Sequence, residues 1–282
     1  MAFKFFKKKK KQETAKAAIT ENAVKEEVSS ASVKSDENPE NNENVKTNEN
    51  AENAKAREEA FFRQLEERRK TDPLIGAKLC GMDMYNKFVN IGKDSDGRMN
   101  CTSFLFNIGC FAGFVCQAAV WKKYVIDAKK PPESVFAIIG KKSGRSYYFG
   151  EQLNKFVGEG QYSFWSLVGG MIANVYPDTP VPDVLKIVEK VSQVIGNEDY
   201  KICGAVEPDK AVKQNSLLWK GFYPLINKYC PDPEEWPTAV GIAAQNAVKI
   251  SKDVLSQEQC FNLLMESAVY MSKMDISKIV SF

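Results

Sequence analysis

The stretch MNCTSFLFNIGCFAGFVCQAAVW, residues 99–121, decides the fold because it is the longest part of the sequence without a charged residue. As one helix it is long enough to cross a bilayer. It also holds Gly109 and Gly113 at the spacing that lets membrane helices pack closely. Five polar side chains interrupt the stretch, however, and a helix that is apolar on all sides also forms the centre of a globular domain. We therefore expect a central core helix, with a membrane span at 99–121 as the alternative.

The segments around this stretch have helical patterns, with one exception. SVFAIIGKKSGRSYYFG, residues 134–150, predicts a hairpin over about 135–149, because two runs of apolar residues flank a turn that contains Gly and Ser. Helices are expected at about 74–91, 100–128, 150–157, 162–176, 182–196, 211–229, 233–251 and 256–274. The sequence therefore predicts a mainly α fold: a compact multi-helix bundle with one small β-hairpin, formed as a single domain by residues 72–282.

Local signals mark several helix ends. Asp232, Pro233 and the two acids that follow supply a cap, a first-turn proline and favourable charge at a helix start. Ser256 and Gln259 fit a capping box. Gly196 is suited to the position just after a helix end.

The N-terminal part of the chain differs from the rest in composition. Residues 1–11 contain six lysines, three phenylalanines and no acid, whereas residues 12–55 are rich in Glu and Asn and lack aromatic residues. A segment of the second kind buries too little apolar area to offset the entropy of ordering. We expect a basic, aromatic segment at 1–11, a disordered acidic linker at 12–55 and a charged amphipathic helix at 56–70.

The basic, aromatic segment predicts contact with an anionic membrane surface. Each lysine near an anionic leaflet contributes about 1 kcal/mol, and aromatic side chains can enter the interface. The expected contact residues are Phe3, Lys4, Phe5, Phe6, Lys7, Lys8, Lys9, Lys10 and Lys11. RNA binding by the same segment, or a solvated tail that binds nothing, are the alternatives. We expect a cytoplasmic protein, peripheral to the inner face of the plasma membrane.

The composition excludes several kinds of chemistry. The chain has no histidine, so neither a Ser-His-Asp triad nor a Cys-His pair can form within it. No two of its seven cysteines are in a CxxC pair, and we expect them to be buried thiols in a reducing cytosol. We expect no catalytic site, metal or cofactor. From residue 56 onward the charges nearly balance, so a nucleic-acid partner is not expected for the folded domain.

A glycine followed four residues later by an amide recurs in three apolar segments. Residues i and i+4 share a helix face, so the glycine allows a close helix crossing and the amide becomes a polar point among apolar residues. We interpret these positions as tightly crossing helices, with a small-molecule pocket as the alternative. The candidate buried polar or pocket residues, which include one further amide, are Asn107, Gly113, Gln117, Gly170, Asn174, Gly241 and Gln245.

Four short stretches carry a family resemblance: DPLIGAK (72–78), FAGFVCQ (111–117), YYFGEQLN (147–154) and MESAVYMSK (265–273). On these stretches, residues from about 72 to 282 resemble a bacterial helical domain family of unassigned function. The resemblance implies a compact bacterial domain and adds no activity.

Three functions are compatible with these observations. The first is a non-enzymatic interaction or scaffold module, tethered by its N-terminus, that acts through a protein partner. The second is an enzyme or small-molecule-binding protein with an apolar pocket between helices. The third is a membrane protein that spans the bilayer at 99–121. We expect the first.

Overall fold

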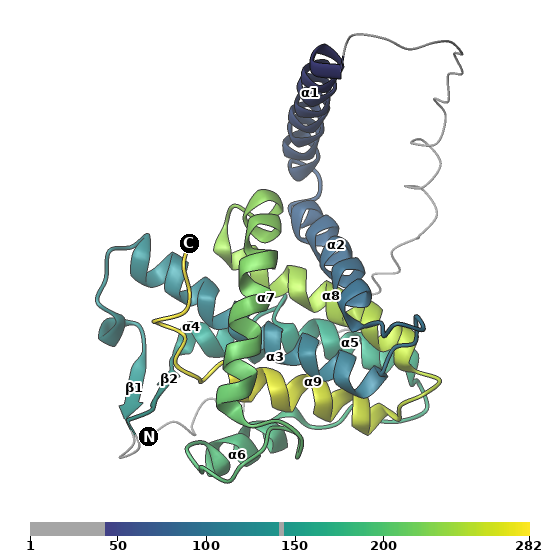
Figure 1. The fold of residues 1–282 in the computed structure, drawn as a ribbon. Helices are drawn as coiled ribbons and strands as arrows, with labels where there is room; N and C mark the ends of the chain where they lie inside the picture. Colours follow the sequence, from purple (N-terminus) through teal and green to yellow (C-terminus); the bar gives the residue numbers. More distant parts are fainter. Residues whose placement is uncertain (1–42, 141–143) are drawn as a thin grey trace. The chain divides into compact units, whose positions relative to one another are not determined.

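The computed structural model describes residues 43–140 and 144–282, and Ala56–Phe282 form one compact unit (Figure 1). The fold is mainly α with one two-stranded antiparallel hairpin, as predicted. The helices are α1 (Glu43–Arg69), α2 (Ile75–Gly92), α3 (Cys101–Val120), α4 (Glu151–Asn154), α5 (Phe164–Val175), α6 (Val184–Val194), α7 (Pro208–Tyr229), α8 (Trp236–Ser251) and α9 (Gln257–Met271). The strands are β1 (Ala137–Gly140) and β2 (Ser146–Phe149).

Helix α3 is the core of this unit. It packs against α2, α7, α8 and α9, and every residue from Ile108 to Val120 is buried. Among the described residues, one helix, Cys101–Ile126, is long and apolar enough to cross a membrane, and 89% of its most apolar window is buried inside the protein. Neighbouring helices cover its apolar surface, which agrees with the core-helix interpretation of residues 99–121.

Two glycines bring α3 against α9. A Cβ on Gly109 would lie 2.6 Å from the Leu264 carbonyl oxygen, and one on Gly113 would lie 2.8 Å from the Ser272 amide nitrogen. The later glycine of α3 meets a later residue of α9, so the two helices run in the same direction. A glycine at each position allows this approach because it has no side chain to separate the backbones.

The hairpin pairs Ala137 with Phe149 and Gly140 with Ser146. Strand β2 is the inner strand, with Tyr147 and Tyr148 buried. The edge of β2 that does not pair with β1 is joined to the segment after α9, because the Tyr148 amide donates to the Lys273 carbonyl oxygen at 2.9 Å. Residues 141–143 of the expected turn lie outside the described residues.

Helix ends agree with the local signals. The Asp232 side chain accepts from the Glu234 amide, and Ser256 and Gln259 form the predicted capping box. Two expected helices change from α-helix to π-helix at their C-terminal ends. The expected helix at 100–128 continues beyond α3 as the π-helical turn η1 (Trp121–Ile126), and the one at 150–157 continues beyond α4 as the π-helical turn η3 (Lys155–Glu159). Two 3₁₀ turns, η2 (Pro132–Ser134) and η4 (Pro233–Glu235), precede β1 and α8.

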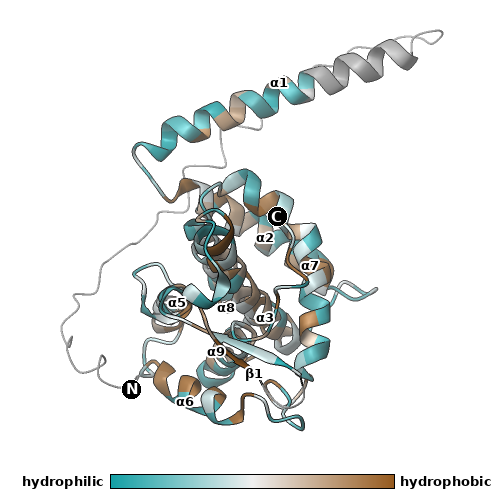
Figure 2. Cartoon of the chain, turned by 90° about the vertical axis from the view of Figure 1, so that its left-hand side faces the viewer, coloured by the Kyte–Doolittle hydropathy of each residue, from teal (hydrophilic) through white to brown (hydrophobic). Residues whose placement is uncertain are grey.

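Helix α1 begins at Glu43, within the segment that we expected to be linker, and not at residue 56. Residues 43–55 contain three Glu, two Ala and two Lys, which have high helix propensity, beside four Asn, which do not. The described side chains of α1 are mostly hydrophilic (Figure 2). The expected basic segment at 1–11 and residues 12–42 of the expected linker lie outside the described residues.

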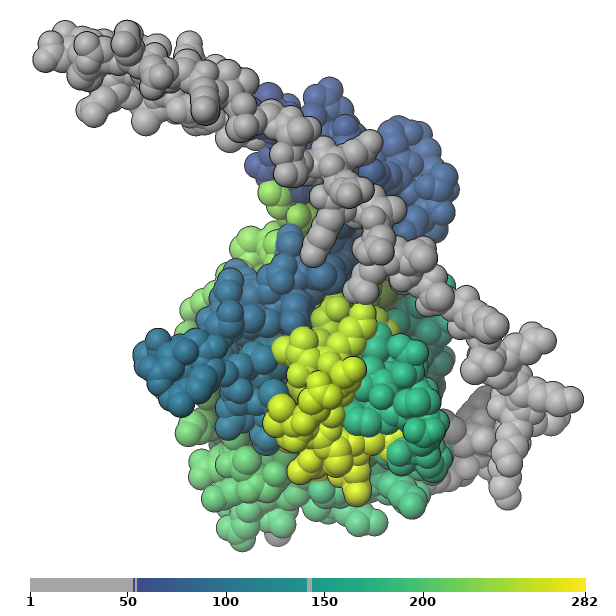
Figure 3. Space-filling model, turned by 90° about the vertical axis from the view of Figure 1, so that its right-hand side faces the viewer, coloured from purple at the N-terminus to yellow at the C-terminus, as the bar shows by residue number. Residues whose placement is uncertain are grey.

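The C-terminal end of α1 is fastened to the domain. Arg69 Nη1 lies 2.6 Å from Glu235 Oε1, and the same guanidinium donates to the Tyr229 carbonyl oxygen. The rings of Phe61 and Phe62 pack on Tyr229. In the space-filling view, segments far apart in the sequence form one continuous surface (Figure 3).

Candidate functional site

The three expected glycine–amide pairs do not meet at one site. In α8, Gly241 packs against the Leu167 side chain, and Gln245 Nε2 donates to the Leu167 carbonyl oxygen at 2.9 Å. This pair therefore holds α8 against α5. The amide has a backbone partner, as the interpretation of tightly crossing helices requires.

Three of the expected positions are exposed: Asn107 in α3, and Gly170 and Asn174 in α5. The expectation that they are buried polar points was wrong. A Cβ added to Gly170 would enter open space, with no atom of a packed neighbour within 4 Å. The i, i+4 spacing places two residues on one face of a helix but does not say whether that face is covered.

Gln117 in α3 is buried without a hydrogen-bond partner. It has no exposed area, and neither its Oε1 nor its Nε2 is paired among the described residues. Gly109, Gly113 and Gln117 follow one another at four-residue steps, so they lie on the face that packs on α9. Gly113 is level with Ser272, and Gln117 is one turn further along. Gln117 is therefore at the level along α3 where α9 ends.

Lys273 follows this end and is almost completely buried, with 8% of its surface exposed. Its Nζ donates to Asn154 Oδ1 at 3.3 Å and lies 5.3 Å from the centre of the Phe149 ring. Burial lowers the pKa of Lys273 to about 8, and the nearby Cys116 and Glu159 oppose this shift. No described carboxylate lies within ion-pair distance of the ammonium group.

Trp121, four residues after Gln117, is the first residue of η1. Its ring packs against Phe136 and Tyr148, and its indole N–H has no acceptor among the described residues. The Tyr148 amide bonds to the Lys273 carbonyl oxygen. Lys273 is thus bracketed between the levels of Gly113 and Trp121, where Gln117 also lies.

These residues define what we call the Lys273 site: Cys116, Gln117, Trp121, Asn154 and Lys273. They come from the end of α3, the start of η1, short helix α4 and the segment after α9. Asn154 is exposed, so the site is nearest to solvent on that side. Gln152 in α4 adds another buried side-chain oxygen without a described partner. Both π-helical turns begin beside the site, and such turns are frequent at functional sites.

The sequence pointed to Gln117 but not to Lys273. Gln117 is an amide in a long apolar helix, which is visible locally. Lys273 is the last residue of MESAVYMSK, and a lysine at a helix end is usually solvated. The apolar residues before it were the available signal.

The cysteines are free thiols, and five of the seven are buried. Burial raises the pKa of Cys116 well above its ordinary value, although the Lys273 charge opposes this shift. A hydrogen bond with Cys80 raises the pKa of Cys230, and burial adds to this shift. The Cys116 and Cys230 thiols are therefore protonated at neutral pH. No cluster of metal-ligating side chains occurs among the described residues.

Glu266 in α9 is the centre of a second polar group. Its Oε1 accepts from the Tyr200 hydroxyl at 2.5 Å and the Cys203 amide at 2.8 Å, and its Oε2 pairs with Lys190 at 2.6 Å. Cys203 has a positive φ of 52°. Both carboxylate oxygens are occupied, so this group joins α6 and the loop before α7 to α9.

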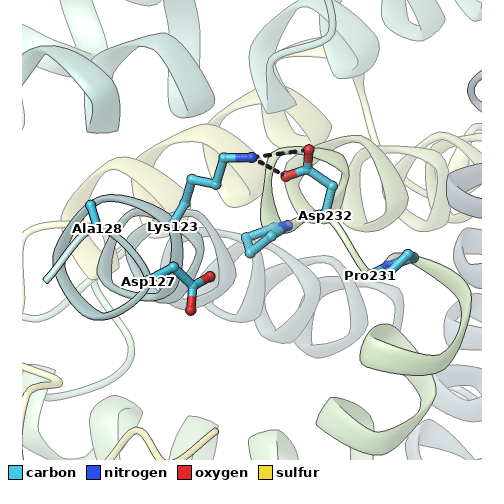
Figure 4. Close-up of a pocket in the computed structure, with 6 residues that line it drawn as sticks. Lys123, Asp127, Ala128, Pro231 and Asp232 are labelled. Atoms are coloured by element: carbon cyan, nitrogen blue, oxygen red, sulfur yellow. Dashed lines mark hydrogen bonds and ion pairs between the residues drawn. The ribbon is translucent and has the colours of Figure 1, made fainter.

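A surface hollow of about 610 Å³ lies between η1 and the segment before η4 (Figure 4). It is lined by Lys123, Asp127, Ala128, Pro231, Asp232 and Pro233. Lys123 Nζ bonds to both carboxylate oxygens of Asp232, at 2.9 and 3.1 Å. None of the expected pocket residues lines this hollow.

The buried donors of the Lys273 site are suited to hold a small anion, because an ammonium group, an amide and an indole N–H all donate hydrogen bonds.

Comparison of the chain with protein-family models, curated proteins and solved structures finds no match.

Proposed function

We propose that this chain is a non-enzymatic interaction module, held at the inner face of the plasma membrane by residues 1–11 and acting through a protein partner. The observation that carries the proposal is the combination of six lysines and three phenylalanines, without an acid, in the first eleven residues. Lysines attract anionic headgroups, and phenylalanines can enter the acyl boundary.

The attachment of α1 supports this proposal. Arg69 and Glu235 bury most of an ion pair, with 15% and 18% of their side chains exposed. Lys228 pairs with Glu58 on the same helix. Ion pairs of Arg69 and Glu58 therefore hold the C-terminal part of α1 to the rest of the domain.

The test is vesicle binding by the full-length protein. Vesicles of phosphatidylcholine with phosphatidylglycerol are compared with vesicles of phosphatidylcholine alone, and bound protein is measured by co-sedimentation. Replacement of the six lysines of residues 1–11 by glutamine should lower partitioning to anionic vesicles by at least about 100-fold. Replacement of Phe3, Phe5 and Phe6 by serine should weaken binding at high salt, where lysine attraction is screened.

The matched control replaces Lys16, Lys25 and Lys34 by glutamine, because these lysines belong to the acidic segment. This variant should bind as the original chain does. Equal binding to neutral and anionic vesicles, or unchanged binding of the six-lysine variant, would refute the tether. Competition by single-stranded RNA with no vesicle binding would favour the RNA alternative.

A further inference from the structure

We propose that the Lys273 site binds a small carboxylate anion. This inference goes beyond the proposed function and does not depend on residues 1–11.

Charge is the first argument. Lys273 is 8% exposed, and its described polar contact is one 3.3 Å hydrogen bond to a neutral amide oxygen. A buried charge without a counter-ion is strongly unfavourable. Glu159 acts on Lys273 only through longer-range attraction. An anion beside Nζ would supply the missing counter-charge.

Unpaired hydrogen-bonding groups are the second argument. The two donors Gln117 Nε2 and Trp121 Nε1 have no acceptor among the residues that the structure describes. Buried polar groups in native proteins are nearly always paired with protein, water or ligand. Gln117 in α3 and Trp121 at the start of η1 are four residues apart. The contact of Gly113 with Ser272 and that of Trp121 with Tyr148, whose amide donates to the Lys273 carbonyl oxygen, put this part of the chain at the level of Lys273.

The hydrogen-bond donors of the Lys273 site are suited to a carboxylate. The ammonium, amide N–H and indole N–H groups can meet the several lone pairs of a carboxylate, which accepts only. A charge-assisted hydrogen bond from Lys273 would be the strongest of these contacts. Exposed Asn154 marks the side from which a ligand of this size would enter.

Cys116 is near Lys273 and does not compete with an anion for its charge. Burial keeps its thiol protonated, so it adds no negative charge beside the ammonium. The carboxylate would therefore be the main counter-ion of Lys273.

The experiment measures thermal unfolding of the full-length protein during titration with sodium acetate, against equal concentrations of sodium chloride. Acetate should raise the melting temperature along a saturable curve, by about 3 °C at ten times its dissociation constant. Equilibrium dialysis with radiolabelled acetate should give one site per chain.

Two variants test the residues. Lys273→Met keeps an unbranched apolar side chain and should abolish both the acetate shift and acetate retention. Gln117→Leu fills the same space without donors and should weaken retention. Lys186→Met, at an exposed lysine of α6, is the matched control and should behave as the original chain does.

Three outcomes would overturn the inference. The first is an equal effect of acetate and chloride on the original chain. The second is an acetate shift that persists in Lys273→Met. The third is the absence of acetate retention in dialysis. Vesicle binding is measured separately, so failure here leaves the N-terminal tether unaffected.

Discussion

Gly113 of α3 and Ala268 of α9 are in such close contact that a Cβ on Gly113 would overlap the Ala268 carbonyl oxygen. The same face of α3 carries Gln117 one turn later. The crossing of these two helices therefore sets how far the Gln117 amide lies from the end of α9. It links the packing of the core to the geometry of the Lys273 site.

Gly113→Ala should destabilise the protein by about 3 kcal/mol, because the added methyl group meets backbone that cannot move without separating the helices. Gly170→Ala is the matched control, since Gly170 is a helical glycine with open space around it. That change should be neutral or stabilising, by up to about 1 kcal/mol. Urea unfolding measures both. Similar free energies of unfolding for the two variants would contradict the close crossing.

Arg69→Met should destabilise the protein by about 2–3 kcal/mol, because it leaves the half-buried Glu235 carboxylate and the Tyr229 carbonyl oxygen without this donor. Arg68→Met, at the exposed neighbouring position, should change stability by less than about 0.5 kcal/mol. Urea unfolding measures the difference. Limited proteolysis should also cleave α1 faster in Arg69→Met, and equal cleavage rates would contradict the fastening of α1.

Lys273 should make stability depend on alkaline pH. Burial lowers its pKa from 10.5 to about 8, so the unfolded chain binds this proton more tightly than the folded chain. Stability therefore rises with pH between about 8 and 10.5, and the penalty is fully present below pH 8. From pH 7.5 to 9.5 the expected gain is about 2 kcal/mol.

The measurement is urea unfolding in buffer without carboxylate, with Lys273→Met as the reference at each pH. Cys116 and Glu159, whose charges act on the pKa of Lys273, are present in both proteins, so the difference isolates the lysine. The same pH slope in both proteins would show that Lys273 is not buried as described.

Glu266→Ala should destabilise the protein by about 3 kcal/mol, because the Tyr200 hydroxyl and the Cys203 amide lose their acceptor in a buried place. Glu189→Ala, at an exposed position of α6, should have an effect below about 0.5 kcal/mol. Thermal and urea unfolding measure both. Hydrogen exchange at the Cys203 amide should accelerate in Glu266→Ala, and unchanged exchange would contradict its bond to the carboxylate.

Much of the fold could be predicted from local patterns. The capping residues at Asp232 and Ser256 mark the helix starts because their hydrogen bonds involve only the next few residues. The hairpin was located for a similar reason. The structure begins α1 at Glu43 and not at residue 56. Residues 43–55 mix Asn with Glu, Ala and Lys, so their composition suits a linker although several of them have high helix propensity.

The candidate site was predictable only in part. Gln117, Asn174 and Gln245 follow glycine at the same spacing, yet one is buried without a described partner, one is exposed and one bonds to Leu167. Spacing defines a shared helix face, whereas the neighbour of that face depends on how separate helices pack. Hydropathy does not distinguish the faces of a helix as uniformly apolar as α3.

The sequence by itself determined the mainly helical composition of the domain and the absence of histidine chemistry, and it favoured a central core helix at residues 99–121 over a membrane span. These properties depend on periodicity, hydropathy and residue type, which are local or additive. Only the tertiary structure decided that Lys273 is buried and that its ammonium group lies near Asn154 and the Phe149 ring. Phe149 and Asn154 contact Lys273 although they are distant from it in sequence. Gly109 and Gly113 allow α9, and with it the segment that carries Lys273, to approach α3.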